Sequence, residues 1–399
     1  MANRFRDCIG YNCGLMAKKP TPQAAMLNMT VGHWVARLIH VVAKLRIADL
    51  LKNGPRTTAD LPSAAGVQAA PLYRVLRALA SVGVFAEIKD GRFKLTPLAA
   101  TLRTDVPDSL AGWALMINEP WVWQSWCEVL HGVQTGEVPF LKAHGMGTFE
   151  YLEKHPDDLA VFGESMTSLS RTENPAIAAA CTFLRHGTLV DVGGGHNSLL
   201  ATILKANPKL QGVLFDQPSV IASAKKDAHV TAKGIAHRCT LEGGSFFESV
   251  PKGADAYIMK YILHDWDDTS CVNILENCRA AMNEKGRVLV VDNVIPPGND
   301  PGWGKLLDLQ MLVIGGRERT QKEFAALFAE AGLKLTRVIP TKCPLSIVEG
   351  GLRLTPSVTK IAQVFAWVRQ IRPRGRYTPN TKRWPRQSGM DCQGYFHYF

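Results

Sequence analysis

The chain has 399 residues, of which 46% are hydrophobic and 20% are charged. These proportions are ordinary for a soluble globular protein, and the length allows two or three domains with sizeable cores. Of the formal net charge of +11, residues 353–399 contribute +8 through nine Lys or Arg residues and one Asp, so the nearly neutral remainder implies no basic groove for nucleic acid.

The cysteines and the hydropathy exclude several further classes. The nine cysteines are scattered, and neither close pair, Cys8 with Cys13 or Cys271 with Cys278, has the spacing of a zinc ribbon or a thioredoxin-like motif. The chain has no apolar run of about 18 residues, and its N-terminus lacks a clear signal-peptide core. We therefore expect a cytoplasmic protein with reduced thiols, no metal site and no membrane association.

The N-terminal third combines an arm with a small helical domain. Residues 1–22 have no hydrophobic period, and we interpret them as a flexible arm. A separate domain is expected over residues 23–105. Apolar positions recur at helical spacing over residues 26–51, and these helices look buried on more than one face, which is typical of an oligomer interface.

A winged-helix pattern follows within this domain. It predicts a short helix opened by Thr57, Thr58 and Leu61, a second helix over residues 71–82, and a hairpin around Asp90 and Gly91. Such a second helix can read the major groove of DNA. Here it offers only Arg74 and Arg77 as cations. A structural or dimerising use is therefore favoured over DNA binding.

The next segment, residues 106–180, is predicted to be helical and is rich in large aromatic residues. Trp123 and Met166 are examples. Such a cluster either packs as core or lines a pocket for a flat apolar substrate, and both uses remain open for this segment.

From residue 181 to residue 350 the pattern alternates between strands and helices. The apolar runs LVDV, GVLF, AYIM and RVLVV, with closing pieces in KLTRVI and LSIVEG, predict an α/β domain with a parallel sheet and helices on both faces. Ligands of such sheets bind above the carboxyl ends of the strands. The basic extension over residues 351–399 holds one potential amphipathic helix, which we interpret as loosely packed or partly disordered rather than bound to a membrane surface.

The stretch LVDVGGGHNSLL reads as a strand, a glycine turn and a helix start, as expected for a nucleotide-like cofactor. Gly193 and Gly195 fit the first two places of the dinucleotide fingerprint, but Ser198 holds the third, which disfavours a pyrophosphate ligand. Asp216 ends the next apolar run, where open α/β sheets place the carboxylate that binds a ribose diol.

A second group of polar residues lies in successive loops on one face of the same domain, two of them at strand ends and one after the apolar helix around residues 307–314. His264 comes after AYIMKYIL, Asp292 ends RVLVV, and Glu318 lies in the turn GGRERT. An imidazole and two carboxylates on successive loops of one face suit a general base that is oriented, and stabilised when protonated, by acids.

Taken in order, these motifs make the chain resemble the S-adenosylmethionine-dependent O-methyltransferases of the plant caffeic-acid type and their bacterial relatives. The resemblance covers residues 26–350 and rests on LVDVGGGHNSLLATIL, LFDQPSVI, GGSFFESVP, MKYILHDW and GGRERTQKEF. It implies a Rossmann-like class I methyltransferase domain with a mostly parallel sheet, preceded by an α-rich winged-helix dimerisation domain. It also implies a homodimer that methylates a hydroxyl of an aromatic, phenolic or polyketide-type small molecule without a metal or nucleic acid.

The resemblance assigns roles to individual residues. It implies that His264 is the general base and that Asp292 and Glu318 flank it. The implied S-adenosylmethionine-binding residues are Asp191, Gly193, Gly195, Asp216, Ser245, Phe246 and Lys260. The expected substrate pocket includes Trp123, Met166 and Met311.

Three positions depart from the family pattern. Asn197 stands where another glycine is usual, which is tolerable because Asn adopts left-handed backbone more readily than most residues. Ser245 replaces an aspartate near the adenine. Asp292 is one methylene shorter than the glutamate of the plant enzymes, so its hold on His264 is expected to be looser or mediated by water.

Two alternatives stay open at this point. A member of the same family could bind the cofactor without transferring methyl. A regulator could instead use the winged helix to bind DNA and the cofactor domain to sense a metabolite.

Overall fold

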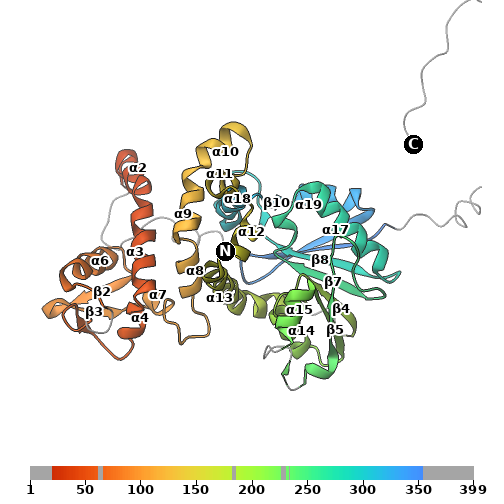
Figure 1. The fold of residues 1–399 in the computed structure, drawn as a ribbon, viewed down its shortest axis with the longest axis horizontal. Coiled ribbons are helices and arrows are strands. Elements are labelled where there is room, and N and C mark those ends of the chain that lie inside the picture. Colours follow the sequence, from red (N-terminus) through yellow and green to blue (C-terminus); the bar gives the residue numbers. More distant parts are fainter. Residues whose placement is uncertain (1–19, 62–65, 182–185, 226–230, 233, 354–399) are drawn as a thin grey trace, which may run out of the picture. The chain divides into compact units, whose positions relative to one another are not determined.

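A seven-stranded sheet with the strand order β11-β12-β8-β7-β4-β5-β6 organises the C-terminal half of the chain (Figure 1). The computed structural model describes residues 20–61, 66–181, 186–225, 231–232 and 234–353. The strands are β4 (Gly187–Val192), β5 (Leu210–Asp216), β6 (Cys239–Gly243), β7 (Ala256–Lys260), β8 (Arg287–Asp292), β11 (Leu333–Pro340) and β12 (Ser346–Leu352).

The side-chain alternation of the central strands builds two cores. Leu189 of β4 and Ile258 of β7 lie in the core on one face, which includes residues of α14 (Ser198–Ala206) and α15 (Pro218–Ala224). Val190 and Tyr257 point to the other face and pack with residues of α17 (Asp268–Ala281) and α19 (Gln321–Glu330). Figure 1 shows α17 and α19 side by side over that face. Burial on both faces explains why these strands read as continuous apolar runs.

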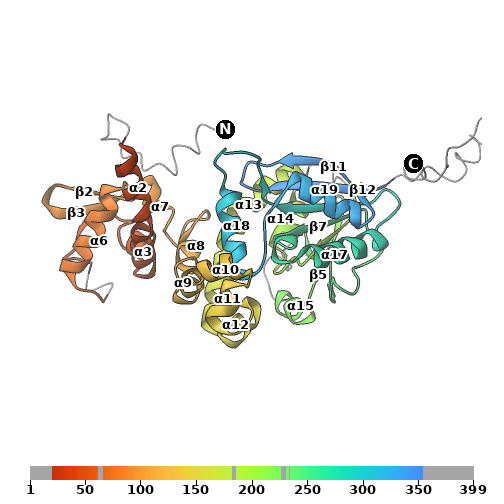
Figure 2. The same ribbon diagram turned by 90° about the horizontal axis from the view of Figure 1, so that it is seen from above.

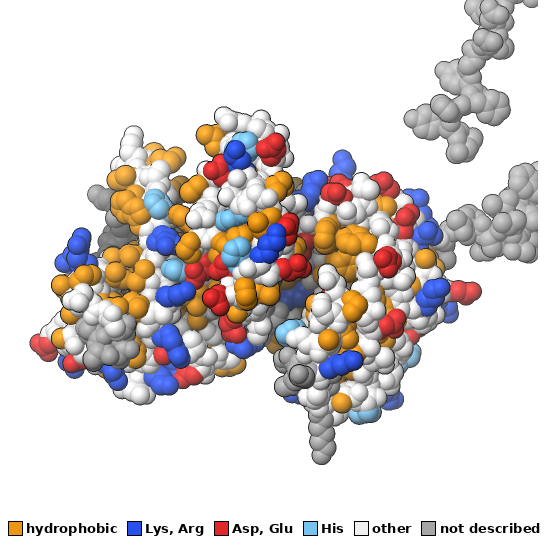
Figure 3. Space-filling model, viewed as in Figure 1, with side chains coloured by type: hydrophobic (Ala, Val, Ile, Leu, Met, Phe, Trp, Pro, Cys, Tyr) orange, Lys and Arg blue, Asp and Glu red, His pale blue; other side chains and the backbone are white. Residues whose placement is uncertain are grey.

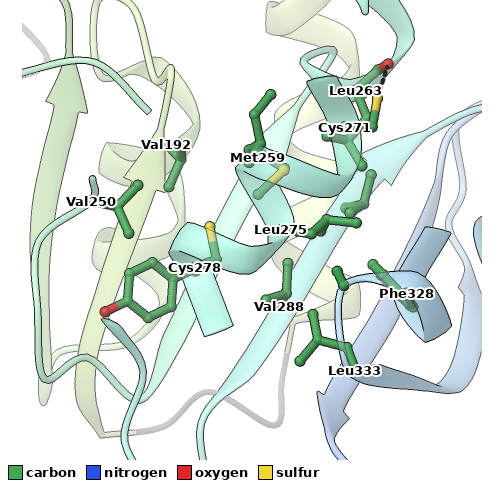
Figure 4. Packing of buried hydrophobic residues seen from close by; sticks show 14 of the residues in the cluster. Val192, Val250, Met259, Leu263, Cys271, Leu275, Cys278, Val288, Phe328 and Leu333 are labelled. Carbon is green, nitrogen blue, oxygen red and sulfur yellow. Dashed lines mark hydrogen bonds between the residues drawn. The ribbon is translucent and has the colours of Figure 1, made fainter. Parts of the chain in front are cut away.

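The core beneath α17 supports the turn that follows β7. Leu263 is fully buried there, and its carbonyl oxygen lies 3.2 Å from the Sγ of Cys271 on α17 (Figure 4). Met259, Leu275 and Val288 belong to the same cluster. The residue before His264 is therefore anchored in the core.

The sheet is mostly parallel, as predicted, but its last two strands are not. β12 pairs antiparallel with β8, and β11 pairs antiparallel with β12 at the sheet edge (Figure 2). The expectation of a parallel sheet is wrong for this pair, because the short connection between the two runs forms a hairpin rather than a helical crossover. β6 was not predicted, since its side chains are only half-buried or exposed and make no apolar run.

Helices fill the segment between the two domains. They are α8 (Ala111–Met116), α9 (Pro120–Cys127), α10 (Val129–Thr135), α11 (Pro139–His144), α12 (Thr148–Lys154) and α13 (Pro156–Ala180), as predicted. Trp121 and Phe140 are buried in a satellite core with Met116. Part of the aromatic content thus serves packing.

The N-terminal part has the predicted winged-helix elements. Its helices are α2 (Pro22–Thr30), α3 (Gly32–Lys44), α4 (Ile47–Leu50), α6 (Ala69–Ser81) and α7 (Pro97–Ala100). Its three-stranded sheet contains β1 (Arg56–Thr57), β2 (Phe85–Ile88) and β3 (Arg92–Leu95), with the turn η1 (Lys89–Gly91) closing the predicted hairpin.

The first predicted helix of the winged-helix pattern differs in the structure. Arg56 and Thr57 form a strand that pairs with β3, so the expected helix does not open at Thr57 as a continuous segment. Thr57 and Asp60 exchange hydrogen bonds of the kind that start a helix. The remainder of that predicted helix lies at residues 62–65, outside the described residues, as do most of the predicted arm and all but the first residues of the basic extension.

The described surface carries charged side chains of both signs and several exposed apolar side chains. On the face shown in Figure 3, Lys and Arg are interspersed with Asp and Glu. Met26, Leu27, Met29 and Trp34 of α2 and α3 are all at least 60% exposed, which agrees with the expectation of surplus apolar surface on these helices. Among the described helices, none combines the length and apolarity needed to cross a bilayer.

Candidate active site

The candidate site lies where the direction of strand order in the sheet reverses. β4 and β7 are neighbours, and the chain leads from β4 outward to β5 but from β7 outward to β8. The connections after two such strands diverge and leave a crevice at their carboxyl ends, which is where open α/β sheets bind ligands. The glycine turn follows β4, and the turn that carries His264 follows β7.

The glycine turn has the backbone that its sequence predicts. Gly193, Gly195 and Asn197 have φ values of 70°, 58° and 66°. The prediction that Asn197 tolerates left-handed backbone is confirmed. A Cβ at Gly193 would lie 2.5 Å from Cδ1 of Ile262, so a side chain here would displace Ile262 in addition to straining the backbone. Gly195 has no such neighbour within 4 Å, so the turn is open on that side.

Asp216 holds the glycine turn from the end of β5. Its carboxylate accepts hydrogen bonds from the backbone N–H of Gly195 at 2.9 Å and of Gln217 at 2.7 Å. This places an acid beside the open side of the turn, where the ribose ligand was predicted.

Asp191 lies beneath the turn and is almost completely buried. Its Oδ2 has no hydrogen-bond partner among the described residues. Burial raises the pKa of Asp191 to about 7, and the nearby charge of Asp216 adds to the rise, while Lys260 opposes it. An orphaned buried carboxylate at a ligand crevice is a feature that a cationic or hydrogen-bonding ligand would relieve.

The predicted adenine neighbours form an aromatic wall. The ring of Phe246 lies 3.7 Å from the position that a Cβ would occupy at Gly193, and it makes edge contacts with Phe247 and Trp266. Ser245 accepts a hydrogen bond from the N–H of Phe247 and so shapes this turn locally.

Lys260, the last residue of β7, contacts the helix α13. Its ammonium group lies 2.8 Å from Oε2 of Glu173 and donates hydrogen bonds to Ser170 and Asn174 at 3.1 Å. Asn174 in turn donates to Ser198 at the start of α14. Lys260 thus joins the helical segment to the cofactor crevice.

His264 lies in the turn η3 (Leu263–Asp265) and is buried. Its Nδ1 is 3.0 Å from Oε1 of Glu318, and its Nε2 is 3.4 Å from Oδ1 of Asp265. The structure therefore brings together His264 and Glu318, as predicted, and adds Asp265 as a second acid in contact with the ring.

A two-stranded parallel pairing explains why distant acids meet at this ring. β9 (Val294–Ile295) follows Asp292 closely, and β10 (Arg319–Thr320) follows Glu318 directly. Arg319 is in register with Val294. The pairing therefore carries Glu318 to the end of β8, where Asp292 lies.

Asp292 makes no direct hydrogen bond to the ring among the recorded contacts. Its Oδ1 accepts a hydrogen bond from the N–H of Tyr261 at 3.2 Å, and its fully buried Oδ2 lacks a partner among the described residues. Burial raises the pKa of Asp292 to about 8, which the charge of His264 opposes. This arrangement is consistent with the expectation that Asp292, with its shorter side chain, holds His264 more loosely.

The imidazole has a strongly acidic environment. Burial by itself would lower the pKa of His264, but the charge of Asp265, the hydrogen bond to Glu318 and the charge of Asp292 together raise it to about 9. Such a ring is a strong base that is stabilised once it carries a proton.

Arg319 and Gly316 hold the turn that carries His264 against the turn that carries Glu318. The guanidinium of Arg319, which is 1% exposed, donates to the carbonyl oxygens of Leu263 and Trp266 and to Asp268. A Cβ at Gly316 would lie 2.1 Å from the carbonyl oxygen of His264, so only glycine permits this contact. Sequence reasoning missed Arg319, although it stands beside Glu318 in GGRERT, because nothing in a sequence marks an arginine as buried.

The predicted pocket residues lie in different places. Met311 of α18 (Trp303–Ile314) is buried beside Gly316, and Met166 of α13 packs against the satellite core. The ring of Trp123 lies by His33 and beneath the guanidinium of Arg37, at 5.7 Å, against α3. The structure thus places Met311 by the His264 turn and Trp123 beside the N-terminal helices.

Two family models match the chain. A family model described as an O-methyltransferase domain matches residues 126–334, and a model described as an O-methyltransferase dimerisation domain matches residues 27–105.

Individual relatives give the same picture. The chain is 45% identical over 325 residues to the phenazine O-methyltransferase of Lysobacter antibioticus, covering 81% of this chain and 94% of that one. It is 39% identical to the mitomycin biosynthesis 6-O-methyltransferase of Streptomyces lavendulae, covering 84% of this chain and 95% of the relative. Its fold matches the crystal structure of an O-methyltransferase from neocarzinostatin biosynthesis, in complex with S-adenosylmethionine and 2-hydroxy-5-methyl naphthoic acid, with a TM-score of 0.67 at 34% identity over 80% of this chain and 96% of that one.

Proposed function

The chain belongs to the O-methyltransferase family, and on this premise we propose that it transfers a methyl group from S-adenosylmethionine to a hydroxyl of an aromatic or polyketide-type small molecule, with His264 as general base. The observation that carries the proposal is the position of His264. It is a buried imidazole, held by Glu318 and Asp265, on the turn that borders the cofactor crevice.

The residues of the crevice fit S-adenosylmethionine. Asp216 offers a carboxylate for the ribose hydroxyls, and Phe246 offers an apolar ring face for the adenine. The open side of Gly195 leaves room against the backbone, and the orphaned oxygen of Asp191 lies below. We assign cofactor binding to these residues together with Gly193, Ser245 and Lys260. The bound cofactor supplies an electrophilic methyl group.

The chemistry assigned to His264 follows from its surroundings. A phenol has a pKa of about 10, so the neutral form of a base with a pKa near 9 accepts its proton with little loss of free energy, and the share of neutral rings grows as the pH rises to about 9. Glu318 orients the ring through Nδ1, and we assign proton acceptance to Nε2, which Asp265 approaches at 3.4 Å. Asp265 and Asp292 stabilise the resulting imidazolium. Proximity of the two reactants supplies much of the remaining rate.

The substrate class rests on the relatives. Their names specify a phenazine, mitomycin biosynthesis and, in the crystal structure, a naphthoic acid as ligand. Each carries or builds on a flat ring system. We propose an acceptor of that kind for this chain, contacted by Met311 and by the helical segment that carries Met166.

We also propose that the active form is a homodimer. The dimerisation model covers residues 27–105, and the exposed apolar side chains of α2 and α3 provide surface for a partner copy.

The test is isotopic methyl transfer to a mixed panel of phenols, phenazines and aromatic polyketides, with wild type and His264→Ala in parallel. We expect methylated product with wild type and a fall of about a hundredfold or more in the variant. Confirmed cofactor binding with no product on any acceptor would instead favour a family member that does not transfer methyl.

A further inference from the structure

Tyr261 is an aromatic residue in the turn after β7 whose ring lies on the imidazole of His264. The two rings are stacked, with centroids 5.0 Å apart and an interplanar angle of 21°. This contact covers a face of the imidazole, whereas Glu318 and Asp265 approach its two nitrogen atoms. The ring plane of His264 therefore has a support that neither acid provides.

The backbone of Tyr261 is in an unusual conformation. Its φ is 57°, in the left-handed region that bulky residues rarely adopt. Its N–H donates to the carbonyl oxygen of Val291 and to Oδ1 of Asp292, both at 3.2 Å. Strained backbone persists only where the surrounding structure holds it, and it concentrates at functional sites. The strain directs the side chain of Tyr261 to a place that ordinary backbone would not reach.

The hydroxyl of Tyr261 is tied to a different element. It donates a hydrogen bond to Oε1 of Glu173 on α13 at 2.7 Å. Glu173 is 5% exposed, and its other oxygen pairs with Lys260 at 2.8 Å. A buried carboxylate that pairs with both residues has little freedom to move.

We propose, on the basis of the function assigned to His264, that Tyr261 is a positioning residue whose ring holds the plane of the imidazole and whose hydroxyl anchors that ring to Glu173. The helix that carries Met166 in the predicted substrate segment thereby sets the orientation of the base. Nothing in the motif MKYILHDW indicates this role, because Glu173 comes from a helix far away in the chain.

The charged and titratable groups that face His264 come from several elements. They are Asp265 on its own turn, Asp292 at the end of β8, Glu318 before β10, and Tyr261 after β7. Arg319 lies behind the same turn, where it donates to the carbonyl oxygen of Leu263. A change at Tyr261 leaves all of these acids in place, so its effect on His264 is separable from a change in local charge.

Two substitutions at this position separate the anchor from the ring. Tyr261→Phe removes only the hydroxyl. Tyr261→Asn removes the ring while keeping a residue that tolerates left-handed backbone, so a loss in this variant does not come from added strain. The matched control is Tyr257→Phe on the same strand, because Tyr257 is fully buried in the opposite core and its hydroxyl bonds only the 251–254 segment among the recorded contacts.

The first readout is the titration of the His264 ring, followed by NMR in protein with 13C-labelled histidine and assigned with His264→Asn. The second is kcat and the cofactor KM as a function of pH. We expect Tyr261→Phe to lower kcat about tenfold and Tyr261→Asn about a hundredfold, with the cofactor KM within about twofold of wild type. Both should displace the His264 titration, whereas Tyr257→Phe should leave titration and kcat unchanged.

An unchanged His264 titration and an unchanged pH profile in both Tyr261 variants would overturn the proposal, as would an equal loss in Tyr257→Phe. Failure of the proposed function has a different signature, since either no acceptor would be methylated by wild type or His264→Ala would methylate at the wild-type rate. The NMR readout does not depend on activity, so it still decides whether Tyr261 holds the ring.

Discussion

Oε1 of Glu318 lies 3.0 Å from Nδ1 of His264, although 54 positions separate the two residues in the chain. Glu318 is 2% exposed, and its N–H donates to Asp308 of α18 at 2.8 Å. The contact is therefore held from both sides, by the pairing of β10 with β9 and by α18.

Glu318→Gln should lower activity without weakening the fold. The amide keeps a hydrogen-bonding atom near Nδ1 but removes the charge that helps to raise the pKa of His264, so the base becomes weaker. We expect kcat at alkaline pH, where the ring is neutral, to fall about tenfold to a hundredfold, and the midpoint of its rise with pH to move to lower pH.

The measurement is kcat against pH, with Glu323→Gln as the control. Glu323 caps α19 and makes no recorded contact with His264. A Glu318→Gln enzyme with the wild-type profile would show that this carboxylate does not tune the base.

Arg319→Met should destabilise the protein strongly. Arg319 is buried and its guanidinium satisfies two backbone carbonyl groups and Asp268, all of which would lose a partner. Because the Asp268 side chain is 55% exposed, we expect the cost to come mainly from the two carbonyl groups, at about 1 to 3 kcal/mol of the free energy of unfolding for each buried group left without this partner. Urea denaturation provides the measurement.

The neighbouring arginine is the control. Arg317 is about half exposed and pairs with Glu323 at the surface, so Arg317→Met should cost less than about 1 kcal/mol. Equal costs at the two positions would contradict the role given to Arg319.

The glycine turn offers a third test. Gly193→Ala adds a Cβ into Ile262 as well as backbone strain, whereas Gly195→Ala adds strain alone on the folded chain. Strain of this kind costs about 1 to 2 kcal/mol. We therefore expect Gly193→Ala to lower the free energy of unfolding more than Gly195→Ala does.

Calorimetry of S-adenosylmethionine binding completes this test. The side of Gly195 that is open in the structure is where we place the cofactor, so Gly195→Ala should weaken binding at least about tenfold despite its milder effect on folding. Unimpaired binding in that variant would place the cofactor elsewhere.

Stability should decline as pH rises from mildly acid to alkaline values. The pKa values of Asp191, Asp292 and His264 are raised to about 7, 8 and 9, so the folded chain holds protons that the unfolded chain has already released. For each of these groups, rising pH lowers the free energy of unfolding by about 1.4 kcal/mol per pH unit between the group's pKa in the unfolded chain and its pKa in the folded chain. For Asp191 this range runs from its ordinary value of 3.8 up to about 7.

Asp191→Asn isolates one of these groups. As the pH rises to about 7, the free energy of unfolding of this variant should fall less steeply than that of wild type. Above that pH the two should fall in parallel. Chemical denaturation at several pH values measures both slopes. Parallel curves throughout would mean that Asp191 is not protonated in the folded chain.

The features that could be predicted from the sequence are those that local motifs encode. The strands, the glycine turn and the left-handed Asn197 follow from short-range pattern and backbone sterics, and the fold class follows from their alternation. His264 could be assigned to the site in advance because it follows a strand whose carboxyl end borders the crevice, and Glu318 because the turn GGRERT was expected on the same face of the domain.

Other features depend on contacts that no local pattern encodes. Glu173 reaches Lys260 and Tyr261 from a helix whose sequence carries no motif for that role. The contact of Asp265 with the imidazole was not predicted, because its orientation depends on the turn η3. The position of Trp123 against α3 likewise depends on tertiary packing.

The central claim is that His264 acts as a general base, and a series of acceptors of graded acidity tests it most directly. Rates of methyl transfer would be measured for wild type and His264→Ala with phenols of one shape whose hydroxyl pKa values run from above to below the assay pH. We predict a loss of about a hundredfold or more for the weakly acidic phenols that shrinks towards none for phenols already ionised, because these need no base. An equal loss across the whole series would contradict the claim and assign His264 to binding alone.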